Sequence, residues 1–186
     1  MSKGRLIAVV GPSGVGKDSV MAGLVARRPK LHLVCRMITR PAHVGGEAFD
    51  AVSDQEFAQH VADQTFALHW QAHGLRYGIA AQQLACLSEG RDALVNLSRG
   101  VLKTADRQFD KMIVLSLTAP SSVLVARLQG RGRESAEQIL ARLARSVFGL
   151  PKGLRVLTVD NSHTLDQTIE TILGALYPDS INREIS

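Results

Sequence analysis

The most specific chemistry in the sequence lies in a glycine-rich heptapeptide, Gly11-Pro12-Ser13-Gly14-Val15-Gly16-Lys17. It has the spacing G-x-x-x-x-G-K and lies between a short apolar run, Leu6 to Val10, and a predicted helix, Asp18 to Arg28. Glycines let successive backbone N–H groups turn inward around a phosphate, and the start of the following helix adds positive potential. A lysine at the seventh position reaches the outer phosphates of a nucleotide. We therefore predict that these residues bind nucleotide phosphates and that Lys17 is catalytic.

The two residues after the lysine are candidates for holding Mg²⁺. A Ser or Thr usually follows the lysine directly and gives its hydroxyl to the metal. Here Asp18 follows Lys17, and Ser19 comes next. Mg²⁺ accepts carboxylate, hydroxyl and water ligands, so the sequence predicts a metal ligand at Asp18, at Ser19 or at both. The alternative is that Asp18 only stabilises the start of the helix.

Arginines are the second group that points to phosphate chemistry. They supply 16 of the 22 basic residues in a chain of net charge +5, and the guanidinium group matches the geometry of phosphate oxygens. Thr39-Arg40-Pro41 follows the second apolar run, where ligands bind in open α/β sheets, so we expect Thr39 and Arg40 to hold a substrate phosphate. A denser set extends from residue 127 to residue 145. It predicts a lid in which Arg131, Arg133 and Arg142 stabilise the transferring group, and the alternative is a solvated surface. The members of the set are Arg127, Arg131, Arg133, Arg142 and Arg145.

Apolar runs alternate with helical stretches through most of the chain, as in a parallel α/β sheet. We predict strands at residues 6–10, 31–36, 92–97, 112–117 and 154–159, and helices at 18–28, 101–107, 121–128, 136–148 and 165–176. The stretch from 38 to 89 breaks this alternation. It contains a capping box at Ser53 and Glu56, a strand pair at 66–70 and 76–78, and a helical stretch at 80–87.

The length of 186 residues fits one domain. We expect a core of residues 1–36, 91–129 and 144–186, a substrate-binding insertion of residues 37–90, and a lid of residues 130–143. The sequence has no run of 18 apolar residues, and its aromatic fraction of 4% disfavours base stacking, so neither a membrane nor a nucleic acid is the expected partner. Cys35 and Cys86 lack metal-binding spacing and predict free thiols and a cytoplasmic location.

In order along nearly the whole chain, these motifs resemble the guanylate kinase superfamily. The matching segments are Gly11–Lys17, Thr39-Arg40-Pro41, Tyr77-Gly78, and the run from Arg127 through Arg131-Gly132-Arg133 to Arg142. The resemblance implies a three-layer P-loop kinase fold with a parallel sheet core, a small substrate-binding insertion and an arginine-rich lid. It also implies ATP as donor, Mg²⁺ as cofactor, an acceptor phosphate held by Arg40 and Tyr77, and an adenine bordered by residues 160–163.

The chain departs from true guanylate kinases where those enzymes recognise the base. They place a Glu and an Asp at the positions that match Leu68 and Leu97 here. A site built to pair with guanine loses discrimination strongly when its acceptors are missing. The resemblance therefore argues against a guanine acceptor.

Within the superfamily, several segments resemble the ribose 1,5-bisphosphate phosphokinase family of phosphonate degradation. They include Gly16-Lys17-Asp18-Ser19, Gly74-Leu75-x-Tyr77-Gly78 and Val95-Asn96-x-Ser98-Arg99. This resemblance implies phosphoryl transfer from ATP to the 1-phosphate of ribose 1,5-bisphosphate, giving 5-phosphoribosyl 1-diphosphate and ADP, with Ser98 and Arg99 as further acceptor ligands. The partners would be a small sugar phosphate and ATP.

Three alternatives stay open at this point. One is a nucleoside monophosphate kinase of the guanylate type, which would phosphorylate GMP. Another is a non-catalytic guanylate-kinase-like interaction module, although Lys17 and the arginines argue against it. The third is a nucleic-acid binder, which rests on the positive charge alone.

Overall fold

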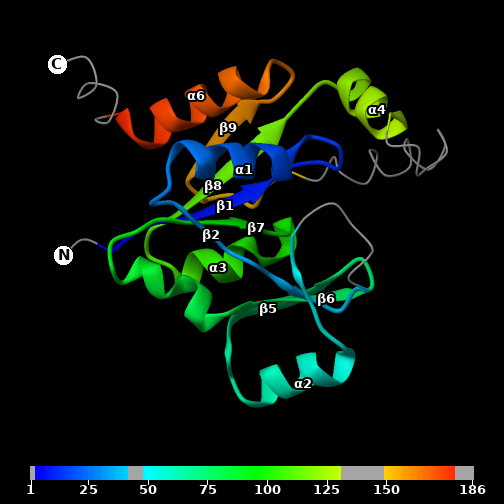
Figure 1. Cartoon of the computed structure of the whole chain (residues 1–186), viewed down its shortest axis with the longest axis vertical. Helices are drawn as coiled ribbons and strands as arrows, with labels where there is room; N and C mark the ends of the chain where they lie inside the picture. The colour runs from blue at the N-terminus through cyan, green and yellow to red at the C-terminus, as the bar shows by residue number, and fades with distance from the viewer. Residues whose placement is uncertain (1–2, 42–47, 131–148, 179–186) are drawn as a thin grey trace.

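The computed structural model of the chain describes residues 3–41, 48–130 and 149–178. Its centre is a parallel sheet of five strands in the order β2-β7-β1-β8-β9 (Figure 1). The strands are β1 (Leu6–Val10), β2 (His32–Leu33), β7 (Ala93–Asn96), β8 (Met112–Thr118) and β9 (Val156–Asp160). Each neighbouring pair is parallel, which confirms the predicted α/β fold with a parallel sheet core.

Strand β1 is a continuous apolar run because both of its faces are covered. Ile7 and Val9 pack with α1 (Lys17–Arg27) and α6 (Leu165–Leu176) on one face. Leu6, Ala8 and Val10 pack with α3 (Leu102–Gln108) on the other. Figure 1 shows this arrangement, with α1 and α6 on one side of the sheet and α3 on the opposite side. Three layers result, as the resemblance implies.

The predicted helices lie within one or two residues of the observed ones. Helix α4 spans Ser121–Gln129, and a short 3-10 helix, η2 (Arg99–Val101), leads into α3. Helix α6 begins with a capping box between Thr164 and Gln167. The predicted helix at 136–148 lies outside the described residues.

The predicted strand at residues 31–36 is wrong in extent. Only His32 and Leu33 pair with β7, while Met37 and Ile38 form β3 in a second sheet. The second sheet has the order β4-β3-β6-β5, with β3 (Met37–Ile38), β4 (Asp50–Ala51), β5 (Phe66–Ala72) and β6 (Leu75–Ala80). The chain leaves the first sheet at this point and carries residues 34–40 into the second.

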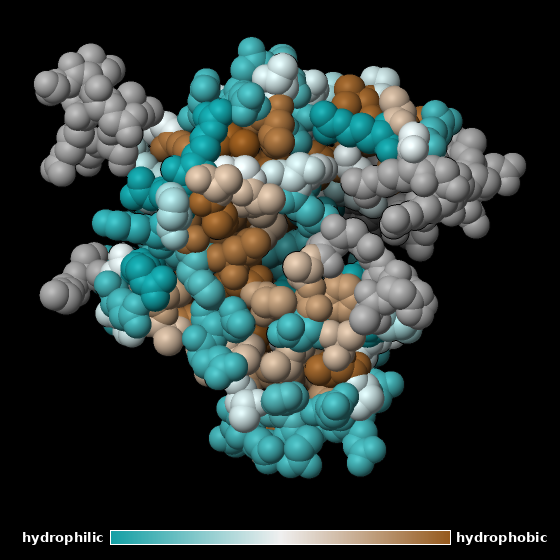
Figure 2. All heavy atoms as spheres, viewed as in Figure 1, coloured by the Kyte–Doolittle hydropathy of each residue, from teal (hydrophilic) through white to brown (hydrophobic). Residues whose placement is uncertain are grey.

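The second sheet centres on the predicted hairpin of β5 and β6. Its turn is made by His73 and Gly74, both with positive φ, as two-residue hairpin turns require. Helix α2 (Asp54–Ala62) has the predicted capping box at Ser53 and covers the outer face of the sheet. There the rings of Phe57 and Phe66 lie 4.8 Å apart. Figure 2 shows that the exposed surface around α2 is hydrophilic, in keeping with Phe57 as its buried residue.

A register shift between Phe66 and Leu68 gives the two faces of β5 different roles. Phe66 faces α2, whereas Leu68 is buried in the same core as β1. Trp70 packs against that core as well, and Tyr77 lies opposite Trp70 on β6. This inner face therefore turns toward the parallel sheet. After β6, residues predicted as a helix form the 3-10 helix η1 (Ala81–Leu87).

Candidate active site

The glycine-rich heptapeptide forms the turn between β1 and α1. Gly14 and Gly16 have φ values of 81° and 92°, in the left-handed region that glycine adopts without strain. The loop is also closely packed, because a Cβ on Gly16 would lie 2.9 Å from the side-chain nitrogen of Asn161. Both glycines are therefore required by backbone conformation and by packing.

Lys17 is the first residue of α1, and its side chain folds back along the loop. Its ammonium donates hydrogen bonds to the carbonyl oxygens of Gly11 at 3.0 Å and Pro12 at 3.3 Å. This places the charge against the backbone that we expect to surround the phosphates. The arrangement agrees with the predicted role of Lys17, which stays a prediction.

Two side chains from outside the loop, Asn161 and Arg127, hold it in place. Asn161 directly follows β9 and is 4% exposed; its amide donates to the carbonyl of Val15 at 2.7 Å. Its amide oxygen accepts a hydrogen bond from Thr168 on α6 at 2.8 Å. Arg127 on α4 donates to the carbonyls of Asn161 at 2.8 Å and Val15 at 3.3 Å. The sequence analysis includes Asn161 among the predicted adenine neighbours and Arg127 in the arginine-rich set, but it predicts neither contact with the loop.

A pocket of about 340 Å³ opens beside the loop. It lies on the side of α4 and of the segment that follows β9, and its lining includes Gly14, Gly16, Ser19, Arg127, Asn161, His163 and Leu165. The predicted adenine neighbours at 160–163 thus contribute two residues to a pocket next to the phosphate loop. The position of this pocket agrees with the predicted adenine site, which stays a prediction.

Ser19 and Asp18 differ in their position relative to this pocket. Ser19 is one of its lining residues and Asp18 is not, although both are exposed. Asp18 lies in the first turn of α1, where a carboxylate stabilises the helix. Within the described ranges, no three His, Cys, Asp or Glu side chains gather into a metal site. Whether Ser19 or Asp18 holds Mg²⁺ therefore stays a prediction.

The predicted acceptor side lies on the inner face of the second sheet. Tyr77 is 8% exposed and stacks on Trp70, with ring centroids 5.3 Å apart and an interplanar angle of 9°. The indole nitrogen of Trp70 donates to the hydroxyl of Ser98 at 2.9 Å. Trp70 thereby connects the hairpin to the segment after β7. No pattern in the sequence predicts this contact between Trp70 and Ser98.

Thr39 and Arg40 follow β3 and have different surroundings. The hydroxyl of Thr39 accepts a hydrogen bond from the backbone N–H of Arg76 at 2.9 Å, so it secures β3 against β6. The guanidinium of Arg40 lies 4.2 Å from the ring centroid of Phe49. The Nε atoms of Arg40 and Arg99 are both buried. Of the predicted phosphate ligands, Thr39 thus has its hydroxyl bound to a backbone N–H. This contact suits a role in positioning β3.

Leu68 and Leu97 belong to one apolar cluster. They are 3% and 4% exposed and pack in the core that β1 shares with the second sheet. The positions that match the guanine-binding carboxylates are thus filled by buried hydrocarbon. This arrangement offers no hydrogen-bond acceptor to guanine at either position.

Strand order sets how these groups face one another. The phosphate loop follows β1, Ser98 and Arg99 follow β7, and Asn161 follows β9. Because β7 and β9 lie on opposite sides of β1, the acceptor residues and the nucleotide pocket flank the loop at one edge of the sheet. The predicted lid residues Arg131, Arg133 and Arg142 lie outside the described residues, as does the lid itself apart from Gly130.

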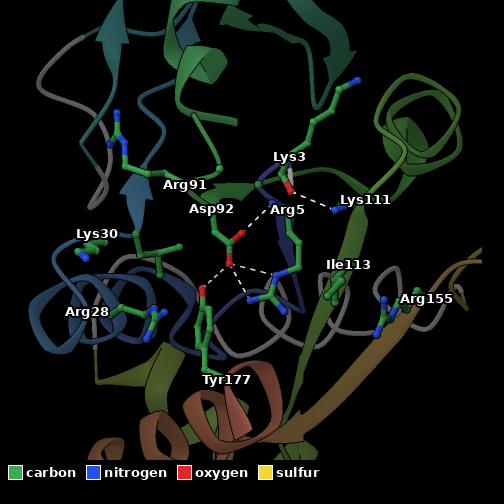
Figure 3. Close-up of a pocket in the computed structure, with 13 residues that line it drawn as sticks. Lys3, Arg5, Arg28, Lys30, Arg91, Asp92, Lys111, Ile113, Arg155 and Tyr177 are labelled. Carbon is green, nitrogen blue, oxygen red and sulfur yellow. Dashed lines mark hydrogen bonds and ion pairs between the residues drawn. The ribbon is translucent and has the colours of Figure 1, made fainter. Parts of the chain in front are cut away.

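A larger hollow of about 520 Å³ lies at the opposite edge, where the strands begin. Figure 3 shows Asp92 at its centre, between Arg5 and Tyr177. The carboxylate accepts hydrogen bonds at 2.7 Å from the Arg5 guanidinium and from the Tyr177 hydroxyl. Arg5 also donates to the carbonyl of Leu176, at the end of α6. These contacts tie β1, β7 and the end of α6 together, far from the phosphate loop.

The ionisation of this cluster follows from its contacts. Burial by itself raises the pKa of Asp92, but the hydrogen bonds from Arg5 and Tyr177 outweigh it and hold that pKa below its ordinary value. Burial and the hydrogen bond to Asp92 raise the pKa of Tyr177 to about 12. A carboxylate paired in this way stabilises the fold; it is not a proton carrier at neutral pH.

Comparison with known proteins agrees with this geometry. The family model for guanylate kinase matches residues 3–173. The fold is also similar to the crystal structure of guanylate kinase from Anaplasma phagocytophilum, with a TM-score of 0.67 at 16% identity, over 96% of this chain and 87% of that one. Among the described residues, no helix is long and apolar enough to cross a membrane.

The chain is similar over most of its length to curated sequences with a more specific name. Ribose 1,5-bisphosphate phosphokinase PhnN of Ruegeria sp. (strain TM1040) is 53% identical over 170 residues, which are 90% of this chain and 89% of that protein. The protein of the same name from Pseudomonas fluorescens (strain SBW25) is 44% identical over 185 residues, 93% and 95% of the two chains. The chain therefore belongs to the guanylate kinase family and, within it, to the ribose 1,5-bisphosphate phosphokinases.

Proposed function

We propose that this chain transfers the γ-phosphoryl group of ATP to the 1-phosphate of ribose 1,5-bisphosphate. An oxygen of the 1-phosphate forms a bond to the γ-phosphorus, and the bond from that phosphorus to the β–γ bridging oxygen breaks. The products are 5-phosphoribosyl 1-diphosphate and ADP. Because the nucleophile is already an anionic phosphate oxygen, the reaction needs no general base.

One observation on this chain supports the proposal independently of the names of its relatives. The chain combines a phosphate loop that includes Lys17 with the predicted phosphate ligands Arg40 and Tyr77, and it has buried leucines at 68 and 97. The acceptor side thus combines phosphate-binding groups with hydrocarbon where guanine would need carboxylates. A phosphorylated sugar without a base suits that combination.

On the donor side, catalysis consists of positioning and charge stabilisation. The backbone of Gly11–Gly16 binds the β-phosphate, and Lys17 exchanges its contacts with the Gly11 and Pro12 carbonyls for the outer phosphates. The lid arginines Arg131, Arg133 and Arg142 are proposed to spread the charge of the transferring group. Mg²⁺ would neutralise charge on the nucleotide phosphates, and Ser19, which lines the pocket beside the loop, is proposed to give it a hydroxyl ligand.

On the acceptor side, Arg40, Tyr77 and Arg99 are proposed to bind the phosphate that reacts. Ser98 is oriented by Trp70, whose indole donates to its hydroxyl and leaves the hydroxyl proton available for a phosphate oxygen. Thr39 acts through the backbone by fixing the end of β3. The use of ATP as phosphoryl donor and the free thiols of Cys35 and Cys86 support the proposal of a cytoplasmic location.

An acceptor panel tests the proposal. ADP formation is measured with ribose 1,5-bisphosphate, GMP and AMP at equal concentrations, with Mg²⁺ present. We expect kcat/KM for the bisphosphate to exceed that for GMP by about a thousandfold or more. Lys17→Ala serves as the control for contaminating kinases and should lower every rate by about a hundredfold or more. Equal use of GMP would reject the sugar-phosphate assignment in favour of a guanylate-type kinase.

A further inference from the structure

Arg36 is a charged side chain that the proposed reaction leaves without a role. It is 7% exposed, and among the described residues no other charged side chain is so fully buried. A guanidinium stays charged at all ordinary pH values, and removing it from water is costly. The burial of Arg36 beside Tyr77 therefore places a permanent positive charge next to the predicted acceptor residues.

The position of Arg36 relates it directly to the acceptor residues. It immediately precedes β3, while Thr39 and Arg40 immediately follow that strand, so two arginines stand at its two ends. The guanidinium of Arg36 lies 5.4 Å from the ring centroid of Tyr77, the residue proposed to bind the reacting phosphate.

Aromatic packing fixes this arrangement. Tyr77 pairs with Ile38 on β3 and stacks on Trp70, which in turn reaches Ser98. One row of contacting side chains thus runs from the second sheet to the end of β7, through Arg36, Tyr77, Trp70 and Ser98. A cation at one end of this row is pre-organised, which lowers the entropy cost of binding an anion there.

The proposed acceptor carries two phosphates, and the residues assigned so far account for the reacting one. The other end of the molecule also bears negative charge and needs a cation within the site. Leu68 and Leu97 offer none. We propose that Arg36 binds the 5-phosphate of ribose 1,5-bisphosphate, at a second phosphate subsite beside Tyr77. This inference rests on the proposed function and adds its specificity for a bisphosphate.

The test compares two acceptors in two proteins. Ribose 1-phosphate has the reacting phosphate but lacks the 5-phosphate. The wild-type enzyme and Arg36→Gln are each assayed with ribose 1,5-bisphosphate and with ribose 1-phosphate. If Arg36 binds the 5-phosphate, either change alone lowers kcat/KM by about ten- to a hundredfold, the scale of a hydrogen bond between charged groups. Both changes together cost little more than one, since the same contact is lost.

Three further measurements separate this role from a structural one. Arg36→Lys keeps the charge and should recover part of the preference for the bisphosphate. Arg107→Gln, on the exposed side of α3, is the matched control and should change neither acceptor. The KM for ATP should stay the same in Arg36→Gln, and its unfolding transition shows whether the variant is folded.

Two results would overturn the subsite. In one, Arg36→Gln lowers the activity with both acceptors by the same factor, which means that the residue acts on the fold. In the other, the wild-type enzyme phosphorylates ribose 1-phosphate as efficiently as the bisphosphate. This second result needs only the wild-type enzyme, so it can be obtained even if the variant does not fold. Absence of any activity of the wild-type enzyme with ribose 1,5-bisphosphate would reject the proposed function itself, and the subsite with it.

Discussion

Lys17, Asp18 and Ser19 are consecutive residues with different surroundings. Lys17 lies along the phosphate loop, Ser19 lines the nucleotide pocket, and Asp18 lies outside that lining in the first turn of α1. The sequence offered Asp18 and Ser19 equally as metal ligands, because both oxygen types suit Mg²⁺. The fold separates them by where each side chain stands on the helix.

We expect Ser19→Ala to raise the Mg²⁺ concentration that gives half-maximal activity by about tenfold, since one ligand is lost. Asp18→Asn should leave that concentration nearly unchanged and lower helix stability by only about 0.5 kcal/mol. Titrations of Mg²⁺ at saturating ATP measure both effects. A large rise for Asp18→Asn with none for Ser19→Ala would assign the metal to the carboxylate instead.

Leu68 is part of the core as well as of the predicted acceptor side. A single substitution at this position should therefore not create a guanine-binding site. Leu68→Glu would place a carboxylate among Leu6, Ile79 and Leu97 in the buried cluster. We expect the free energy of unfolding to fall by about 3 kcal/mol or more, without a gain of GMP activity. Leu68→Met is the control and should cost less than about 1.5 kcal/mol. A stable Leu68→Glu variant that phosphorylates GMP would contradict this view.

At the scale of elements, the loop depends on neighbours that are distant in sequence. Asn161 links the Val15 carbonyl to Thr168 of α6, and Arg127 adds a link from α4. The conformation of the phosphate loop is therefore set jointly by α4, by the segment after β9 and by its own glycines. The two contacts to the Val15 carbonyl join residues more than 100 positions apart, which no local sequence pattern reports.

Asn161→Ala should loosen this connection. The Val15 carbonyl and the Thr168 hydroxyl each lose a buried partner, so we expect a loss of about 1–3 kcal/mol in stability and a raised KM for ATP. Thr171→Ala is the matched control, because it removes a hydrogen bond to the Gln167 carbonyl on α6 without touching the loop. An unchanged KM for ATP in Asn161→Ala would show that the loop holds its shape independently.

The parts of the fold that sequence predicted well are those with strong local signals. The apolar run of β1, the glycine-rich turn and the capping box at Ser53 each specify their own structure. The run at 31–36 was misassigned because an apolar strand carries no signal of the sheet it joins, and the change of sheet at this point depends on β6 and β7. Arg36 and Trp70 were missed for the same reason: their roles arise from pairing between strands.

At the scale of the whole molecule, the two edges of the parallel sheet have separate tasks. The carboxyl edge holds the phosphate loop and its neighbours, whereas the amino edge holds the cluster of Arg5, Asp92 and Tyr177 (Figure 3). That cluster joins the first strand to the end of the last described helix. It should therefore govern stability and its pH dependence, and leave the chemistry unaffected.

The pKa of Asp92 is lower in the folded chain than its ordinary value, so its ionised form stabilises the fold above about pH 4. This contribution is lost as pH falls through the lowered pKa. Asp92→Asn should reduce the free energy of unfolding by about 2 kcal/mol at pH 7, and the difference from wild type should shrink below about pH 4. Denaturant titrations from pH 7 to pH 3 measure it. Asp110→Asn, at an exposed ion pair, is the control, and a difference independent of pH would contradict the account.

The central claim is that an anionic phosphate on a sugar, and not a nucleotide, accepts the phosphoryl group. The most direct test is ³¹P NMR of the protein with ATP, Mg²⁺ and ribose 1,5-bisphosphate. We predict two coupled signals from a new diphosphate at C1 of the sugar, rising in step with ADP, while the 5-phosphate signal persists. Formation of ADP with inorganic phosphate alone, or an unchanged spectrum from enzyme that binds ATP, would contradict the claim.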